Sequence, residues 1–121
     1  MNNRIPPPDM VRAINLELCY IKMILDTPDQ VEFIEREKCL RTLAKLGITL
    51  SGCYTYFRQL TYHNYLSGPE DDLDTGEADC IWKFVITINS IEIYIKVKNE
   101  APDRLKILSF HEAERPIKYR F

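Results

Sequence analysis

The segment from Cys80 to His111, CIWKFVITINSIEIYIKVKNEAPDRLKILSFH, decides the fold of this 121-residue chain. Between Ile91 and Lys98, isoleucine or valine alternates with charged residues and a tyrosine, which is the period-two pattern of a half-buried β-strand. The preceding run, 81–88, has the same character, and Asn89-Ser90 between the two runs suits a two-residue hairpin loop. We therefore predict a β-hairpin at the centre of the fold.

A loop of that length also sets the register of the hairpin. Ile88 would face Ile91, and the apolar pairs would continue along one face of the sheet to Trp82 opposite Val97. A slip of one residue would move every apolar side chain to the wrong face. On the other face, the same register sets three polar residues close together: Lys83, Lys96 and Tyr94.

A third strand is predicted at 105–111, after a turn that contains a proline and an aspartate. Its register stays open. In one alternative, Leu105 and Ile107 face the core and turn His111 inward as well. In the other, Leu108 and Phe110 face the core and His111 lies on the tyrosine side of the hairpin.

The part of the chain before Cys80 predicts three helices that cover one face of the sheet. The first would begin at an Asp9 N-cap and end near residue 26, after a proline-rich, extended lead at 1–8. The second would begin at Thr27 in a capping-box pattern and end at Gly47. The third would run over 50–60 from a Thr49 cap, and 67–79 would be a solvated acidic loop. The expected fold is α+β, with N-terminal helices packed on one face of a small antiparallel sheet, in a single domain at 1–121.

Charge and composition limit the classes of function. The net charge of −2 is unusual for an RNA-binding protein, but residues 80–121 carry eight basic and five acidic side chains, whereas 62–79 carry six acidic and no basic ones. The four cysteines form no CxxC pair, which favours reduced, mostly buried thiols over a zinc site. We find no apolar segment long enough to span a membrane and no signal peptide, so we predict a cytoplasmic protein.

An ordered set of short motifs is similar to that of the MqsR-like toxins, which are toxin components of bacterial type II toxin–antitoxin pairs. The similarity runs from about Leu40 to the C-terminus and excludes the first helix. Its pieces are LAKLGIT at 43–49, YLSGPEDD at 65–72, IWKF at 81–84, EIYIK at 92–96, SFH at 109–111 and YRF at 119–121. The resemblance implies a RelE-like fold, metal-independent cleavage of mRNA without a cofactor, and a cognate antitoxin protein with a helix-turn-helix domain as partner.

Ribonucleases of this kind make the RNA 2′-OH attack the neighbouring phosphate, which requires a base, an acid and a cation. Histidine has a suitable pKa, tyrosine can transfer a proton beside a cation, and lysine stabilises phosphate charge. We therefore assign proton transfer to Tyr94 and His111 and phosphate binding to Lys96 and Lys83. By resemblance, Lys83, Tyr94 and His111 occupy the family's catalytic places. Further RNA contacts are predicted for Lys98, Lys106, Arg120, Tyr65 and Ser67.

Two alternatives to catalysis remain at this point. The chain could be a non-catalytic RelE-like module that binds a partner protein, or an inactive toxin homologue, because Ser67 stands where the family has a lysine. It could also be a small α+β domain whose polar sheet face is merely solvated. Catalysis requires His111 to lie on the same face of the sheet as Tyr94. The structure tests the catalytic hypothesis through this placement.

Overall fold

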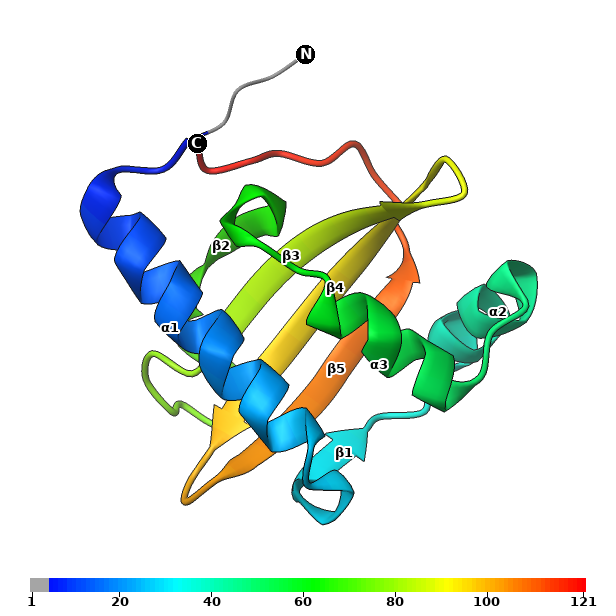
Figure 1. Cartoon of the computed structure of the whole chain (residues 1–121), viewed down its shortest axis with the longest axis horizontal. Coiled ribbons are helices and arrows are strands. Elements are labelled where there is room, and N and C mark those ends of the chain that lie inside the picture. Colours follow the sequence, from blue (N-terminus) through cyan, green and yellow to red (C-terminus); the bar gives the residue numbers. More distant parts are fainter. Residues whose placement is uncertain (1–4) are drawn as a thin grey trace.

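The computed structural model describes residues 5–121, which form an α+β fold with three α-helices and a five-stranded, mostly antiparallel sheet (Figure 1). The N-terminal lead predicted at 1–8 lies partly outside these residues. The sheet has the order β1-β5-β4-β3-β2. The helices are α1 (Pro8–Leu25), α2 (Glu37–Leu46) and α3 (Leu50–Arg58). The strands are β1 (Val31–Phe33), β2 (Tyr65–Glu70), β3 (Ile81–Ile88), β4 (Ile91–Glu100) and β5 (Arg104–Glu112).

The central hairpin has the predicted register. Ile88 pairs with Ile91, Trp82 with Val97, and every pair between them matches. Asn89 and Ser90 adopt positive φ values of 51° and 65°, as a tight hairpin loop that follows the strand twist requires. The apolar face predicted for β3 and β4 is therefore confirmed.

The two registers considered for β5 are each partly right, because the strand contains a β-bulge. Ser109 pairs with Lys96, but the next pair is Ile107 with Val97, so Leu108 is an extra residue. The bulge shifts the alternation and buries Leu105, Ile107 and Phe110 in one core. The expectation that Leu108 faces the core was wrong, since it is only half-buried.

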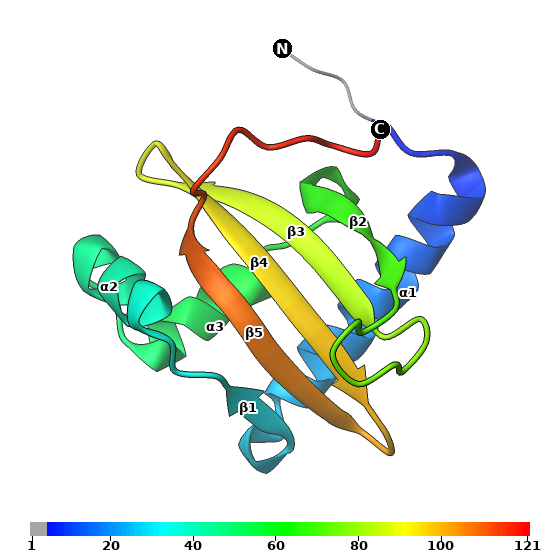
Figure 2. The same cartoon turned by 180° about the vertical axis from the view of Figure 1, so that it is seen from behind.

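The hydrophobic core lies between the sheet and the helices α1 and α3, which cross one face of the sheet (Figure 1). Helix α2 lies beside β5, where the Thr42 hydroxyl accepts a hydrogen bond from the Glu112 backbone N–H at 3.0 Å. Figure 2 shows the opposite face, with the C-terminal tail running past the strand ends toward β2. Fully buried members of the core include Ile14, Ile21, Phe57, Phe84, Ile93, Ile95, Val97, Leu105 and Phe110.

The helix starting at Thr27 was a wrong prediction. The Thr27 side chain makes no capping hydrogen bond, and Pro28–Gln30 is a single 3₁₀ turn. Val31–Phe33 is instead strand β1, which pairs in parallel with β5. The backbone of β5 would otherwise leave an unpaired sheet edge, and this long-range pairing outweighs the local helix signal.

The other helix boundaries are closer to expectation. Helix α1 begins at Pro8, so Asp9 lies inside its first turn and is not its cap. Helix α2 ends at Gly47 with a φ of 68°, as predicted. The Thr49 side chain accepts a hydrogen bond from the Gly52 N–H at 3.1 Å and so caps α3, as predicted. Strand β2 continues to Glu70, so the predicted acidic loop is shorter than expected.

Candidate functional site

The sheet face opposite α1 and α3 carries two rows of side chains across its strands. In one row, Ser67 of β2 pairs with Lys83 of β3, which pairs with Lys96 of β4, which pairs with Ser109 of β5. In the neighbouring row, Tyr94 pairs with His111. All four residues predicted to be catalytic therefore lie on one face, and Ser109 joins them.

Tyr94 and His111 are in ring contact, with centroids 5.4 Å apart. Nδ1 of His111 lies 2.9 Å from the backbone carbonyl oxygen of Glu112. A carbonyl oxygen only accepts hydrogen bonds, so Nδ1 carries the proton and Nε2 keeps the lone pair when the ring is neutral. His111 is 5% exposed, but it lies on the Tyr94 face and not beneath α1 and α3, as catalysis requires.

A cavity of about 780 Å³ opens onto this pair. The sheet face forms its floor, and the start of α2 and the C-terminal tail form its walls. The charged side chains in its lining are basic, with Glu114 as the acidic exception. Lys38 is paired with Glu114 at 3.1 Å, which leaves the cavity a net positive charge. The lining includes Tyr94, Lys96, Ser109, His111, Arg36, Lys38, Glu114, Arg115 and Lys118.

No pattern in the sequence assigned Arg36 and Lys38 to this site. They precede or begin a helix whose charged side chains have the spacing of an ordinary solvated face, and only the docking of α2 beside β5 brings them to the cavity. Arg115 and Lys118 were recognisable only as part of a basic tail. Ser109 was detectable in principle, because it is two residues from His111 on the same strand.

Lys83 lies beside this site, but Glu70 already neutralises its charge. The two side chains form an ion pair at 2.9 Å. Burial lowers the pKa of Lys83, yet the hydrogen bond and charge of Glu70, together with Tyr94, outweigh burial and leave the pKa raised. Burial raises the pKa of Glu70, but hydrogen bonds to Lys83 and Ser67 and the charge of Lys96 leave it lowered. Lys83 and Glu70 are therefore both charged at neutral pH.

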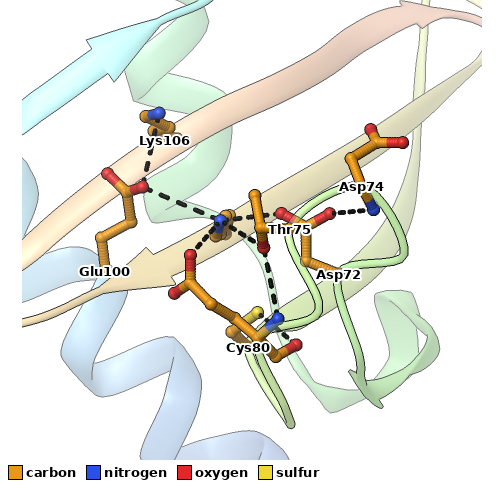
Figure 3. A network of polar contacts seen from close by, with 8 residues as sticks. Asp72, Asp74, Thr75, Cys80, Glu100 and Lys106 are labelled. Atoms are coloured by element: carbon orange, nitrogen blue, oxygen red, sulfur yellow. Dashed lines mark hydrogen bonds and ion pairs between the residues drawn. The ribbon is translucent and has the colours of Figure 1, made fainter.

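Lys98 and Lys106 were predicted to contact RNA, and the structure gives them other roles. Lys98 is 3% exposed, and its ammonium lies 2.7 Å from Asp72 and 2.9 Å from Glu77. Figure 3 shows the polar network to which Asp72, Glu100 and Lys106 belong. Lys106 pairs with Glu100 at 3.3 Å and does not line the cavity. The loop after β2 is therefore fastened to β4 by Lys98, while most of its residues remain exposed, as predicted.

This network predicts an acid-sensitive loop. The hydrogen bond from Lys98, with the Asp74 backbone N–H, lowers the pKa of Asp72 from 3.8 to about 2. A lowered pKa in the folded state stabilises the fold above the unfolded value, and the contribution is lost as the pH falls from about 4 to about 2. We expect Lys98→Gln to destabilise the protein at pH 7 and progressively less below pH 4, as measured by urea unfolding. Lys106→Gln is the control, and a pH-independent difference for Lys98→Gln would contradict the assignment.

Tyr65 and Arg120 were also predicted to bind RNA, but they hold the C-terminal tail against β2. Tyr65 is buried and donates a hydrogen bond from its hydroxyl to the Gly68 carbonyl oxygen at 2.6 Å. The Arg120 guanidinium donates to the Tyr65 hydroxyl at 3.1 Å, and Phe121 stacks on the Tyr65 ring. Neither Tyr65 nor Arg120 lines the cavity.

Other features of the described chain bear on its chemistry. Cys39, Cys53 and Cys80 are buried free thiols, and Cys19 is exposed. Among residues 5–121, no group of three or more His, Cys, Asp or Glu side chains could hold a metal ion together. None of the helices in this range combines the length and apolar character that crossing a bilayer demands.

Comparisons of the chain with protein-family models, with curated proteins and with solved structures found no match. Function is therefore inferred from the side chains on the Tyr94 face, from the cavity above them, and from the motifs described for the sequence.

Proposed function

We propose that the protein is an endoribonuclease that cleaves mRNA through the Tyr94–His111 pair, as the toxin of a type II toxin–antitoxin system. The observation that carries the proposal is the cross-strand contact of these two rings beneath a cavity rich in Lys and Arg side chains. A proton-transfer pair within a cationic cavity suits a phosphodiester substrate, because the cations stabilise the charge that develops on phosphorus-bound oxygens.

In this mechanism, Nε2 of His111 takes the proton from a ribose 2′-OH. The 2′-oxygen then bonds to the adjacent phosphorus, and the bond from phosphorus to the 5′-oxygen breaks. Tyr94 gives its phenolic proton to the leaving 5′-oxygen. The products are a 2′,3′-cyclic phosphate and a 5′-hydroxyl, and the reaction requires no metal ion or other cofactor.

The phosphate would be held by Lys96, which pairs with Ser109 and lies two residues from Tyr94 on the same strand. Lys83, which interacts with Tyr94, would favour the tyrosinate that forms when the proton leaves. Arg36, Arg115 and Lys118 line the walls and would contact neighbouring phosphates. The ordered motifs support the assignment to the MqsR-like class, and with it a cognate antitoxin that carries a helix-turn-helix domain.

The test is cleavage of a single-stranded RNA by the purified protein in the presence of EDTA. We expect products with 2′,3′-cyclic phosphate and 5′-hydroxyl ends, identified by mass spectrometry. A matched RNA with a single 2′-deoxyribose at the cleaved position should be bound but not cut there, because the nucleophile is missing. Cleavage of the deoxy-substituted position at the normal rate would refute the mechanism.

A non-catalytic module is the second candidate, and the low exposure of His111 favours it. In that case the cavity would bind an anionic partner without reaction. The same experiment separates the two functions: RNA that stays intact in the presence of the folded protein would support the protein-binding module.

A further inference from the structure

A second cavity, of about 930 Å³, lies between α1 and the end of β4 with its following turn. Helix α1 crosses one face of the sheet (Figures 1 and 2). Tyr94 and the basic cavity belong to the opposite face, so the two cavities lie on opposite sides of the sheet. Its lining is mostly apolar, and no Lys, Arg or His of the described chain contributes to it. The proposed cleavage makes no use of this cavity.

Glu17 gives this cavity an unusual polar feature. The side chain is 7% exposed, and its Oε1 accepts a hydrogen bond from Asn99 Nδ2 at 2.7 Å. Among residues 5–121, nothing hydrogen-bonds with Glu17 Oε2 or Asn99 Oδ1. Burial raises the pKa of Glu17 to about 7, although the Asn99 hydrogen bond opposes the shift. Two buried acceptors thus lack donors, which is costly in a folded protein.

The outer surface of α1 gives the cavity an apolar rim. Ile14, Leu18 and Ile21 face the core, but Leu16 is 74% exposed and Met23 is 59% exposed. Leu16, Tyr20 and Met23 recur at helical spacing, and all three line the cavity. Helix α1 therefore has a second apolar stripe, which faces solvent, and such stripes mark protein-binding surfaces.

We propose that this cavity binds a partner polypeptide, which inserts a Lys or Arg side chain between Glu17 and Asn99. An ammonium or guanidinium group supplies the donors that both acceptors lack, and the aliphatic stem of the side chain suits the apolar wall. Asp103 near Tyr20 adds negative charge, whereas the charge of Glu100 in the lining is already paired with Lys106 at 3.3 Å. Leu16 and Met23 would be covered only by a ligand that carries apolar groups beside its cation. A polypeptide carries such groups, and a simple amine does not.

The inference is independent of RNA cleavage, because a partner bound to α1 would leave the Tyr94 face open. The probes are Ala-based helical peptides with one central Lys or Arg and leucines three and four residues to either side. Trp82, the only tryptophan of the chain, lines the cavity, so its fluorescence reports occupancy. Cys19 also lines the cavity and is the exposed cysteine, so a bound peptide should slow its alkylation.

We expect at least one cationic peptide to bind wild-type protein and to lose about tenfold or more in affinity when norleucine replaces its Lys or Arg. Glu17→Gln keeps the acceptor for Asn99 and should cause a similar loss. Binding should weaken as the pH falls from 8 to 6, because Glu17 becomes protonated, and Glu17→Gln should remove that dependence. The other titratable groups at this site are Cys19, Tyr20, Glu100 and Asp103, and burial raises the pKa of Tyr20 further above this range. Because Glu17→Gln leaves these groups unchanged, any pH dependence that they cause would persist in that variant.

Leu16→Asp is a second variant. Its position is exposed, so misfolding is not expected, and it should also lower the affinity for the peptide. Three results would overturn the proposal. The first is that no cationic peptide changes Trp82 fluorescence or Cys19 alkylation. The second is that n-butylamine binds as tightly as the best peptide. The third is that sedimentation shows a dimer of the free protein that Leu16→Asp dissociates, which would make a second copy of the chain the occupant.

Discussion

His111→Ala is expected to lower the rate of RNA cleavage by about 10²–10⁴-fold, the range that removal of a general acid or base produces. The loss should appear in kcat, because the ring transfers a proton and Lys96 and the wall cations hold the phosphates. RNA affinity should change little. The measurement is single-turnover cleavage of a short RNA, with a parallel binding assay on its 2′-deoxy analogue.

The chain offers a matched control, because it has only one other histidine. His63 is exposed and its ring contacts the Tyr62 ring, outside the cavity, so His63→Ala should cleave RNA at the wild-type rate. Thermal unfolding should accompany the assay, since the His111 ring also holds the Glu112 carbonyl group. A folded His111→Ala variant with wild-type cleavage would exclude the proposed base.

Gly68→Ala is expected to destabilise the fold by about 3 kcal/mol, which corresponds to a fall of about 10 °C in Tm for a domain of this size. Gly68 has a φ of 123°, which side-chain-bearing residues rarely adopt. An added Cβ would also lie 2.6 Å from the Ile81 carbonyl oxygen. That oxygen belongs to the backbone of a central strand, so it cannot move aside as a flexible side chain could.

Gly76→Ala separates the two causes of this loss. Gly76 also has a positive φ, of 80°, but no atom lies within 4 Å of the added Cβ. Its variant should lose only about 1 kcal/mol, from backbone conformation alone. Chemical unfolding of both variants provides the measurement, and equal losses would show that the close approach of β2 to β3 adds nothing.

Local patterns were most reliable where one strand pair is joined by a two-residue loop. The alternation in β3 and β4 leaves a single register that buries Trp82 and Val97 together, and Asn89-Ser90 permits it. Short-range capping was also predictable, because Thr49 and Gly47 act on backbone groups a few residues away. The Lys83–Lys96 pair followed directly from the same register.

Local sequence patterns gave wrong predictions where a segment distant in the chain determines the backbone conformation. The 27–30 capping signal is local, whereas β1 forms because the β5 edge is available to pair with it. The alternation pattern also did not predict the bulge at Leu108. Strict alternation predicts either Leu105 or Phe110 in the core, and the structure buries both. Without the bulge, the position of His111 could not be decided.

The sequence by itself determined the α+β class, the central hairpin and the shared face of Lys83, Tyr94 and Lys96, because period-two burial and a two-residue loop act over short distances. Only the tertiary structure decided which lysines remain available in the cavity. Lys96 lines the basic cavity, whereas Lys98, two residues away on the same face, is buried by carboxylates from the loop after β2. Alternation assigns a side chain to a face, but its ion pairs depend on segments that are distant in the chain.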